Sequence, residues 1–196
     1  MRDNFKDQHR SNPGNPDKAR PRQVTEWARL EEVGDLHYHA SAYSTALDYY
    51  GQLIDEEVLS LLDRDRAVQV LRKAVDSNIL LGNFDQVEIL LDRADDLIAR
   101  TSGVADPEEM AVHRAIFQTR RSTALRERGR IHDALNLAKR AFSVLALTDE
   151  HSDVAILQVG MGICYSRLGR LDKAEEFFYD GLSTFRRIGH DLGVAN

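Results

Sequence analysis

Two neighbouring histidines and a single cysteine are the residues of this chain best suited to metal or nucleophilic chemistry. His37 and His39 are two positions apart, so on a helix their side chains point roughly 200° apart and we expect no shared metal. Cys164 is the only cysteine, which excludes an intramolecular disulfide and a zinc site built from thiolates. No histidine stands at a spacing that would activate it, so we interpret Cys164 as a small buried apolar residue.

Three acidic clusters raise the question of a metal site or of general acid catalysis. They are Asp55-Glu56-Glu57, Asp95-Asp96 and Glu175-Glu176. Each lies among apolar residues at helical spacing, as expected for the wet face of a helix. The sequence also contains no Gly-rich phosphate loop, no Ser-His-Asp order and no cluster with metal-ligand spacing. We therefore predict no catalytic, metal or cofactor site, and a binding module rather than an enzyme.

Composition sets the outer bounds of the fold and of the partners. The 196 residues are 42% hydrophobic and 30% charged, enough for one moderate domain or a short repeat array. The net charge of -6 disfavours nucleic acid as a partner. No apolar stretch is long enough for a bilayer or resembles a secretory signal, so we expect a cytoplasmic protein without a membrane partner. Residues 1–22 hold three of the four prolines and few apolar residues, which predicts a disordered tail before a repeat domain at 23–196.

A short phrase recurs along the chain and indicates how it is organised. It reads GNFDQVEILLDRA from residue 82, GRIHDALNLAKRA from 129 and GRLDKAEEFFYDG from 169, with a weaker copy, SAYSTALDYYGQL, from 41. The copies start 41, 47 and 40 residues apart, which is typical of a repeat array. Such an array offers an extended binding surface rather than a buried catalytic pocket.

Apolar residues at helical spacing from Gln23 onward predict eight helices. Their ranges are 23–40, 43–57, 64–81, 84–100, 107–128, 131–147, 151–168 and 171–188. The connectors inside each pair have only two or three residues, so the two helices of a pair must run antiparallel. The sequence therefore predicts four helical hairpins.

Several of the predicted helix ends carry residues with a known capping role. Asp106-Pro107 predicts a capped helix start with proline in the first turn. Gly129 and Gly169 predict helix ends with a positive φ. Thr148-Asp149 and Ser152-Asp153 predict caps before the last hairpin.

These hairpins resemble tetratricopeptide repeats. The fourth copy has the family's packing residues at Met161, Gly162, Tyr165, Gly169, Leu171, Ala174, Phe178 and Gly181. The earlier copies match less fully, at Gly34, His37, Ala46 and Tyr50, then at Leu71, Ala74, Gly82, Phe84, Val87, Leu91 and Ala94, then at Leu125, Gly129, Ile131, Ala134, Ala138 and Ala141. The third copy departs at Arg121 and Ser122, where the family has an apolar residue and a small one. The resemblance covers residues 27 to 196.

The resemblance implies an all-α, right-handed solenoid of about four hairpins that acts in protein–protein interaction or scaffolding. The period exceeds the usual length of the repeat and resembles the long arrays of bacterial transcription regulators and kinesin light chains. We expect the sensory or regulatory part of a bacterial regulator, and an N-terminal piece of a longer array. Two alternatives are a receptor for a short peptide and a structural adaptor that self-associates.

The register of the family also implies which residues meet a partner. The residues expected to line the groove are Asp35, Tyr38, His39, Arg72, Asp76, Thr119, Thr123, Arg126, Val159, Ile163 and Arg167. The residues expected in a homodimer contact at the open C-terminal end are Phe177, Phe178 and Tyr179. The expected partner is a protein or a peptide, and no cofactor is expected.

Overall fold

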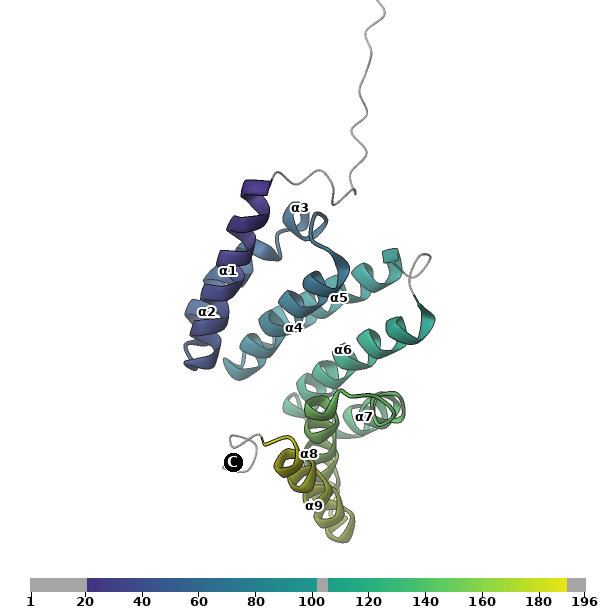
Figure 1. The fold of residues 1–196 in the computed structure, drawn as a ribbon. Coiled ribbons are helices and arrows are strands. Elements are labelled where there is room, and N and C mark those ends of the chain that lie inside the picture. The colour runs from purple at the N-terminus through teal and green to yellow at the C-terminus, as the bar shows by residue number, and fades with distance from the viewer. Residues whose placement is uncertain (1–20, 102–105, 190–196) are drawn as a thin grey trace, which may run out of the picture.

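A stack of helical hairpins is the architecture of this chain. The computed structural model describes residues 21–101 and 106–189, and in these residues it contains nine helices and no strand (Figure 1). The helices are α1 (Pro21–His39), α2 (Tyr43–Leu53), α3 (Glu56–Leu59), α4 (Arg64–Leu80), α5 (Phe84–Thr101), α6 (Pro107–Glu127), α7 (Ile131–Leu145), α8 (His151–Arg167) and α9 (Leu171–Arg187). The predicted helix ranges are confirmed to within a few residues, except at the end of the second.

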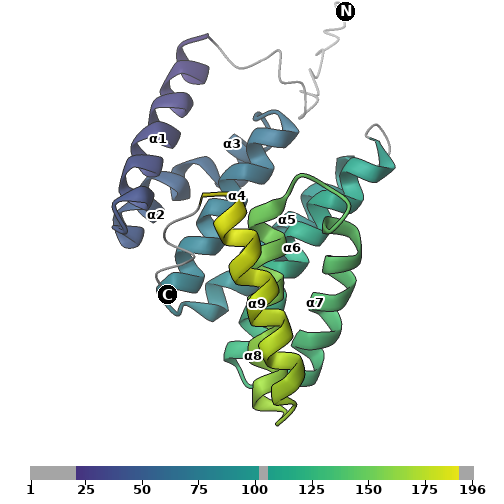
Figure 2. The ribbon, with the colours of Figure 1, turned by 60° about the horizontal axis from the view of Figure 1, so that its bottom comes forward.

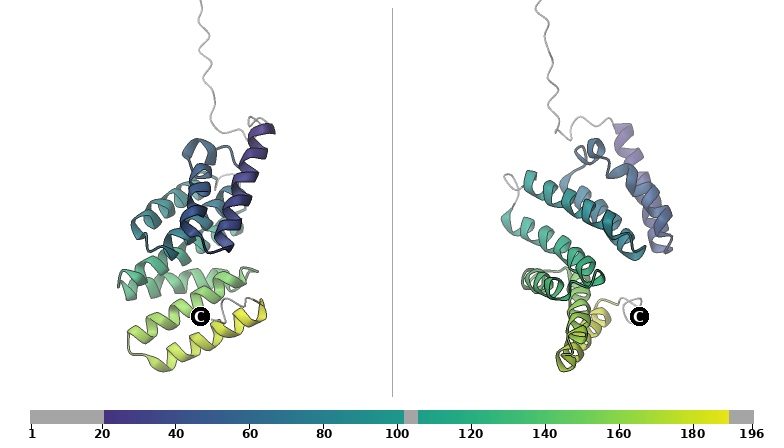
Figure 3. Two further views of the ribbon diagram at one scale, coloured as in Figure 1. Left: turned by 90° about the vertical axis from the view of Figure 1, so that its left-hand side faces the viewer. Right: turned by 180° about the vertical axis from the view of Figure 1, so that it is seen from behind.

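The hairpins are α1–α2, α4–α5, α6–α7 and α8–α9, and they follow one another along the stack (Figure 3). The first helices of successive hairpins, α1, α4, α6 and α8, contact one another in series, and we call them the inner helices. The outer helices α2, α5 and α7 each pack against the inner helix of the next hairpin. The predicted all-α solenoid of four hairpins is therefore confirmed. Every helix in the described residues is too short or too polar to span a lipid bilayer.

The turn inside each hairpin has the same geometry in all four copies. Gly82, Gly129 and Gly169 have φ values of 73°, 78° and 72°, in the left-handed region that suits glycine. In the first hairpin Ser41 takes this place with a φ of 59°, and the next amide, of Ala42, donates to His37 O at 2.8 Å. The weaker copy of the phrase thus makes the same turn with a residue that pays a steric cost there.

The segment after α2 differs from the prediction of one helix over 43–57. Asp55 has φ and ψ of -54° and 138°, which ends α2, and its side chain accepts a hydrogen bond from Glu57 N at 3.0 Å. Aspartate competes for backbone donors in this way and favours a helix start over a helix interior. The short helix α3 follows and leads the chain into the second hairpin.

The apolar core consists of two clusters that meet at α6. The first joins residues of α1 to α5 with Met110, Phe117 and Ala124 of α6. The second joins residues of α7, α8 and α9 with Ala115 and Ile116 of α6. One helix therefore contributes side chains to the cores of both halves of the stack.

The two departures of the third copy have separate roles in packing. Ser122 is buried, and its hydroxyl donates to Ala134 O across the hairpin at 2.9 Å. Arg121 extends to the preceding hairpin, where its Nη2 lies 3.0 Å from carboxylate oxygens of both Asp92 and Asp95. A hydrogen bond and two exposed ion pairs replace the apolar contacts of the family pattern.

The structure differs from the sequence prediction at Leu171 in the last hairpin. Leu171, expected at a packing position, is 66% exposed, so that expectation was wrong. Phe84 and Ile131 stand at the same place after their glycines and are partly buried against the core clusters. The expected disordered tail at 1–22 lies outside the described residues, apart from the last two, which begin α1.

The turn of the first hairpin generates a stability prediction. Ser41→Gly relieves the left-handed strain of a residue with a Cβ, and we expect the free energy of unfolding to rise by about 0.5–1 kcal/mol. The reverse change, Gly129→Ser, serves as the matched control and should lower it by about 1 kcal/mol. Urea denaturation followed by circular dichroism measures both. A Ser41→Gly protein less stable than the wild type would contradict the assignment of strain to this turn.

Candidate functional site

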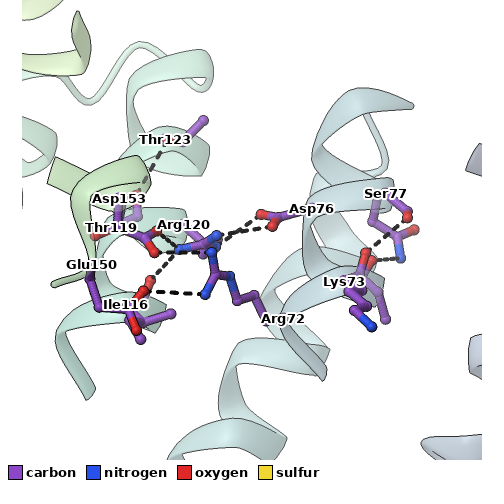
Figure 4. A network of polar contacts seen from close by, with 12 residues as sticks. Arg72, Lys73, Asp76, Ser77, Ile116, Thr119, Arg120, Thr123, Glu150 and Asp153 are labelled. Atoms are coloured by element: carbon purple, nitrogen blue, oxygen red, sulfur yellow. Dashed lines mark hydrogen bonds and ion pairs between the residues drawn. The ribbon is translucent and has the colours of Figure 1, made fainter. Parts of the chain in front are cut away.

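A buried arginine joins three of the inner helices (Figure 4). The side chain of Arg120 in α6 is only 4% exposed. It donates two parallel hydrogen bonds to Asp76 of α4, from Nε to Oδ1 at 2.9 Å and from Nη2 to Oδ2 at 3.0 Å. Its Nη1 donates to Ile116 O at 3.1 Å and to Oδ1 of Asp153 of α8. One guanidinium therefore bonds to the second, third and fourth hairpins at once.

A second arginine reaches past the third hairpin to the fourth. Arg72 Nη2 lies 3.2 Å from Asp153 Oδ2, an ion pair that lacks hydrogen-bond geometry, and Arg72 Nη1 lies 3.5 Å from Glu150 Oε2. Asp153 is fully buried between Arg72 and Arg120. We call Arg72, Asp76, Arg120, Glu150 and Asp153 the central network.

The position of Arg120 in α6 explains its burial. It stands four residues after Ile116 and four before Ala124, and both of these are buried in the core. Burial alone would lower the pKa of Arg120, but the carboxylates of Asp76 and Asp153 raise it above its ordinary value. The guanidinium therefore stays charged, and its two carboxylates compensate for the lost hydration.

A second polar network connects α1 with α4 near the start of the array. Lys73 Nζ lies 3.2 Å from Glu31 Oε1 and 2.8 Å from Asp35 Oδ2, and Arg66 Nε lies 2.8 Å from Glu31 Oε2. The Tyr50 hydroxyl donates to Asp35 Oδ1 at 2.7 Å. Burial and this bond to Asp35 raise the pKa of Tyr50 above its ordinary value.

A third set of polar contacts connects α6 with α8 at their C-terminal ends. Arg126 Nε donates to Glu127 Oε1 at 3.0 Å, and Arg167 Nη1 donates to the backbone oxygen of Arg126 at 2.9 Å. The Nη1 atom of Arg126 also lies over Gly160, where an added Cβ would approach it to 3.0 Å. Each boundary between neighbouring inner helices thus carries its own polar contacts.

Some of the residues expected to line the groove bond to other side chains of the protein, whereas others have no such bond in the described part of the chain. Those engaged in the three networks are Asp35, Arg72, Asp76, Arg126 and Arg167. Thr119 is buried and donates to Ala115 O at 2.9 Å, while Thr123 is half-buried and donates to Thr119 O at 3.3 Å. Of the remaining side chains, His39 is exposed, and Tyr38, Val159 and Ile163 are half-buried. Val159 also packs over Gly181 of α9.

Tyr38 lies beside the central network. Burial raises the pKa of Tyr38 to about 12, with a further rise from the nearby charge of Asp76. Its ring meets His39 edge-on at 5.8 Å between centroids and Tyr43 at 5.6 Å. Aromatic surface from α1 therefore adjoins the paired charges of α4 and α6.

Sequence reasoning missed Arg120, Glu150 and Asp153 as members of a site. Thr148-Asp149 and Ser152-Asp153 were expected to cap α8, but its N-cap residue is Glu150 and no side chain caps the helix. The Thr148 hydroxyl oxygen accepts from Glu150 N at 3.2 Å, in the turn before the helix. Asp153 is instead a buried member of the central network. The sequence did contain one signal: Arg120 is a charged residue at a position where the spacing of apolar residues in its helix predicts a buried side chain.

The remaining residues that could bind a metal or act as a nucleophile have other partners or are buried. His37 stacks on Tyr49 at 5.5 Å between ring centroids, and Cys164 is buried, which raises the pKa of its thiol. Asp65, Glu109 and His113 offer ligand atoms within 4.8 Å of one another. Arg64 pairs with both carboxylates, so this group already contains a cation.

Removing the buried arginine should be far more costly than removing its neighbour. We expect Arg120→Gln to lower the free energy of unfolding by about 3–5 kcal/mol, because it leaves Asp153 buried with a single partner. Arg121→Gln, the matched control, should change it by less than about 1 kcal/mol, because its carboxylate partners are exposed. Urea denaturation compares the two proteins. Equal losses would contradict the central role of Arg120.

The family profile described as tetratricopeptide repeat matches residues 113–187. A search of curated protein sequences gave no match. Two solved structures named MamA, MSR-1 C2 and AMB-1 P212121, align over 83% and 80% of this chain and 98% of each of theirs, with 18% and 16% identity and TM-scores of 0.34 and 0.35. Such scores add no argument, and the likeness rests on the profile: residues 113–187 match the tetratricopeptide repeat family, and α1–α5 continue the same stack of hairpins.

Proposed function

We propose that this chain is a protein–protein interaction module, because residues 113–187 match tetratricopeptide repeats, which are protein-interaction scaffolds. The module is the regulatory domain of a bacterial transcription regulator, located in the cytoplasm, and its inner face binds a protein partner. The observation that carries the proposal is the set of polar networks that fix the inner helices to one another. A surface held in this way loses little entropy when a partner binds.

The centre of the inner face is occupied by the chain's own side chains. Arg72 and Asp153 close the space between the second and fourth hairpins. The surface left for a partner lies on either side of this closure. On one side are Tyr38 and the exposed His39, and on the other are the half-buried apolar residues Val159 and Ile163. The face therefore has an aromatic end and an aliphatic end, and the partner should match both.

The peptide-receptor alternative has its own supporting contact. The Arg72–Glu150 contact, at 3.5 Å, is the longest in the central network. A carboxylate of a peptide would replace Glu150 there and bond to Arg72 as Glu150 does. Binding would then loosen the second hairpin from the fourth, which is a change of state that a receptor needs.

Capture of partners with matched variants tests the inner face. The bait is the 196-residue chain, and Ile163→Asp together with His39→Ala should lower the amount of captured partner at least about tenfold, since a charge enters the aliphatic end. Asp96→Asn and Ser183→Ala on outer helices form the control and should change nothing. Deletion of the gene followed by transcript profiling tests the regulatory role. Capture that depends equally on the inner and outer variants would overturn the proposal.

Self-association is the second candidate, and the last hairpin favours it (Figure 2). Leu91 and Ala138, nine residues after their glycines, are buried by the following hairpin, whereas Phe178 at the same place is 38% exposed. Tyr179 is 72% exposed. Phe177, by contrast, stacks on Tyr165 at 5.4 Å and serves the core of its own chain. A second copy would bury Phe178 and Tyr179.

Light scattering across a concentration series measures this association. We expect the wild-type mass to rise toward that of a dimer, because burial of the exposed apolar surface of α9 contributes about 25 cal/mol for each Å². Tyr179→Lys should keep the chain monomeric. Ile89→Lys replaces an exposed apolar residue of α5, 48% exposed against 72% for Tyr179, and is the control. A wild-type monomer at all concentrations would contradict the homodimer and leave the inner face as the functional surface.

A further inference from the structure

Three cationic side chains converge on one aromatic ring at the outer side of the fourth hairpin. Lys139 Nζ, Arg170 Cζ and Lys173 Nζ lie 5.5, 5.5 and 5.6 Å from the centroid of the Tyr165 ring. Lys139 belongs to α7, whereas the other two flank the start of α9. Segments of two different hairpins therefore place three positive charges over the same ring. We call Lys139, Arg170 and Lys173 the cationic cluster.

The cations of this cluster have no carboxylate partner among the described residues. All three side chains are exposed, and in the described chain none forms an ion pair with a carboxylate. This contrasts with the inner face, where Arg66, Arg72 and Arg120 are each paired. The chain as a whole has a net charge of -6, so the cluster gathers positive charge on an acidic protein.

The ring gives the cluster a fixed base. Tyr165 is 3% exposed and stacks on Phe177 with an angle of 15° between the rings, so it cannot turn freely. Cations within about 6 Å of an aromatic centroid are attracted to the ring, which offsets part of the repulsion among the three. The ring thus holds the three charges together at the surface, where a negatively charged group can reach them.

The surface beside the cluster has room for a segment of polypeptide. A hollow of about 530 Å³ is lined by residues 169–173, which include Arg170, Lys173 and the exposed Leu171. Asp172 also lines this hollow and is the one negative charge in its lining. The site thus combines positive charge with one apolar contact.

From this geometry we infer that the cationic cluster is a docking site for an acidic segment of a protein partner, in which Asp or Glu side chains pair with Lys139, Arg170 and Lys173. The inference rests on the proposed function as a protein-interaction module and places a second contact on the outer side of the stack. Charge selects the segment here, because carboxylates of the partner neutralise three cations that the chain itself leaves unpaired. Leu171 offers an apolar contact between them.

Fluorescence anisotropy with a labelled decapeptide of alternating Asp and Glu tests the site, at about 50 mM salt where screening is weak. The triple change Lys139→Gln, Arg170→Gln and Lys173→Gln should weaken binding by about tenfold or more, as three lost ion pairs imply. Arg29→Gln, Arg114→Gln and Arg186→Gln remove the same charge from exposed positions elsewhere and should weaken it less than about threefold. Asp172→Asn should strengthen binding, because it removes the repelling carboxylate.

The outcomes separate this inference from the proposed function. Equal losses in both triple variants, or no binding by the wild type, would overturn the docking site. A single-stranded oligonucleotide that binds as tightly as the peptide would overturn the choice of a protein partner. Ile163→Asp should leave peptide binding unchanged, since it lies on the inner face. Suppose that Ile163→Asp abolishes capture of partners while the cluster variants bind the peptide as tightly as the wild type does. The inner-face proposal then stands and the cluster inference fails.

Discussion

The burial of one positive charge, on Arg120, is the constraint on which the stack depends. Its guanidinium lies between Asp76 and Asp153 and so bonds to helices of three hairpins. A buried ion without partners costs several kcal/mol, and only this one arrangement of α4, α6 and α8 supplies both carboxylates. Apolar contacts allow small rotations between neighbouring helices, but the forked bonds to Asp76 tolerate much less. The network therefore fixes the geometry that packing alone leaves adjustable.

The same network joins the two apolar clusters of the array. Repeat proteins are usually described by contacts between nearest neighbours alone. Here Arg72 of the second hairpin pairs with Asp153 of the fourth, so the array has a contact that passes over one hairpin. Since α6 contributes to both apolar clusters, the polar bridge lies where one half of the stack meets the other. Loss of this bridge would affect how the halves cooperate, whereas loss of an exposed pair such as Arg130–Asp133 would have a local effect.

The regular part of the fold could be read from the sequence because it follows from local rules. Helical periodicity gave the hairpins, and glycine at a positive φ gave the turns at Gly129 and Gly169. The end of α2 was missed because Asp55 reads equally well as an exposed residue within a helix. The central network was missed for a different reason. Register assigns Arg72 and Asp76 to a surface, but only the curvature of the stack brings Asp153 to them.

This contrast also bears on how the protein recognises its partners. Side chains that face one another across the inner face, such as Lys73 and Asp35, neutralise each other and exert little field on an approaching molecule. The cationic cluster faces solvent without a partner, and its field extends over about a Debye length, roughly 10 Å at moderate salt. In the proposed mode of binding, charge acts first at the outer side of the fourth hairpin and steers an acidic segment there. Shape acts afterwards at the inner face, where Tyr38 and Ile163 lie on inner helices that ion pairs join to one another.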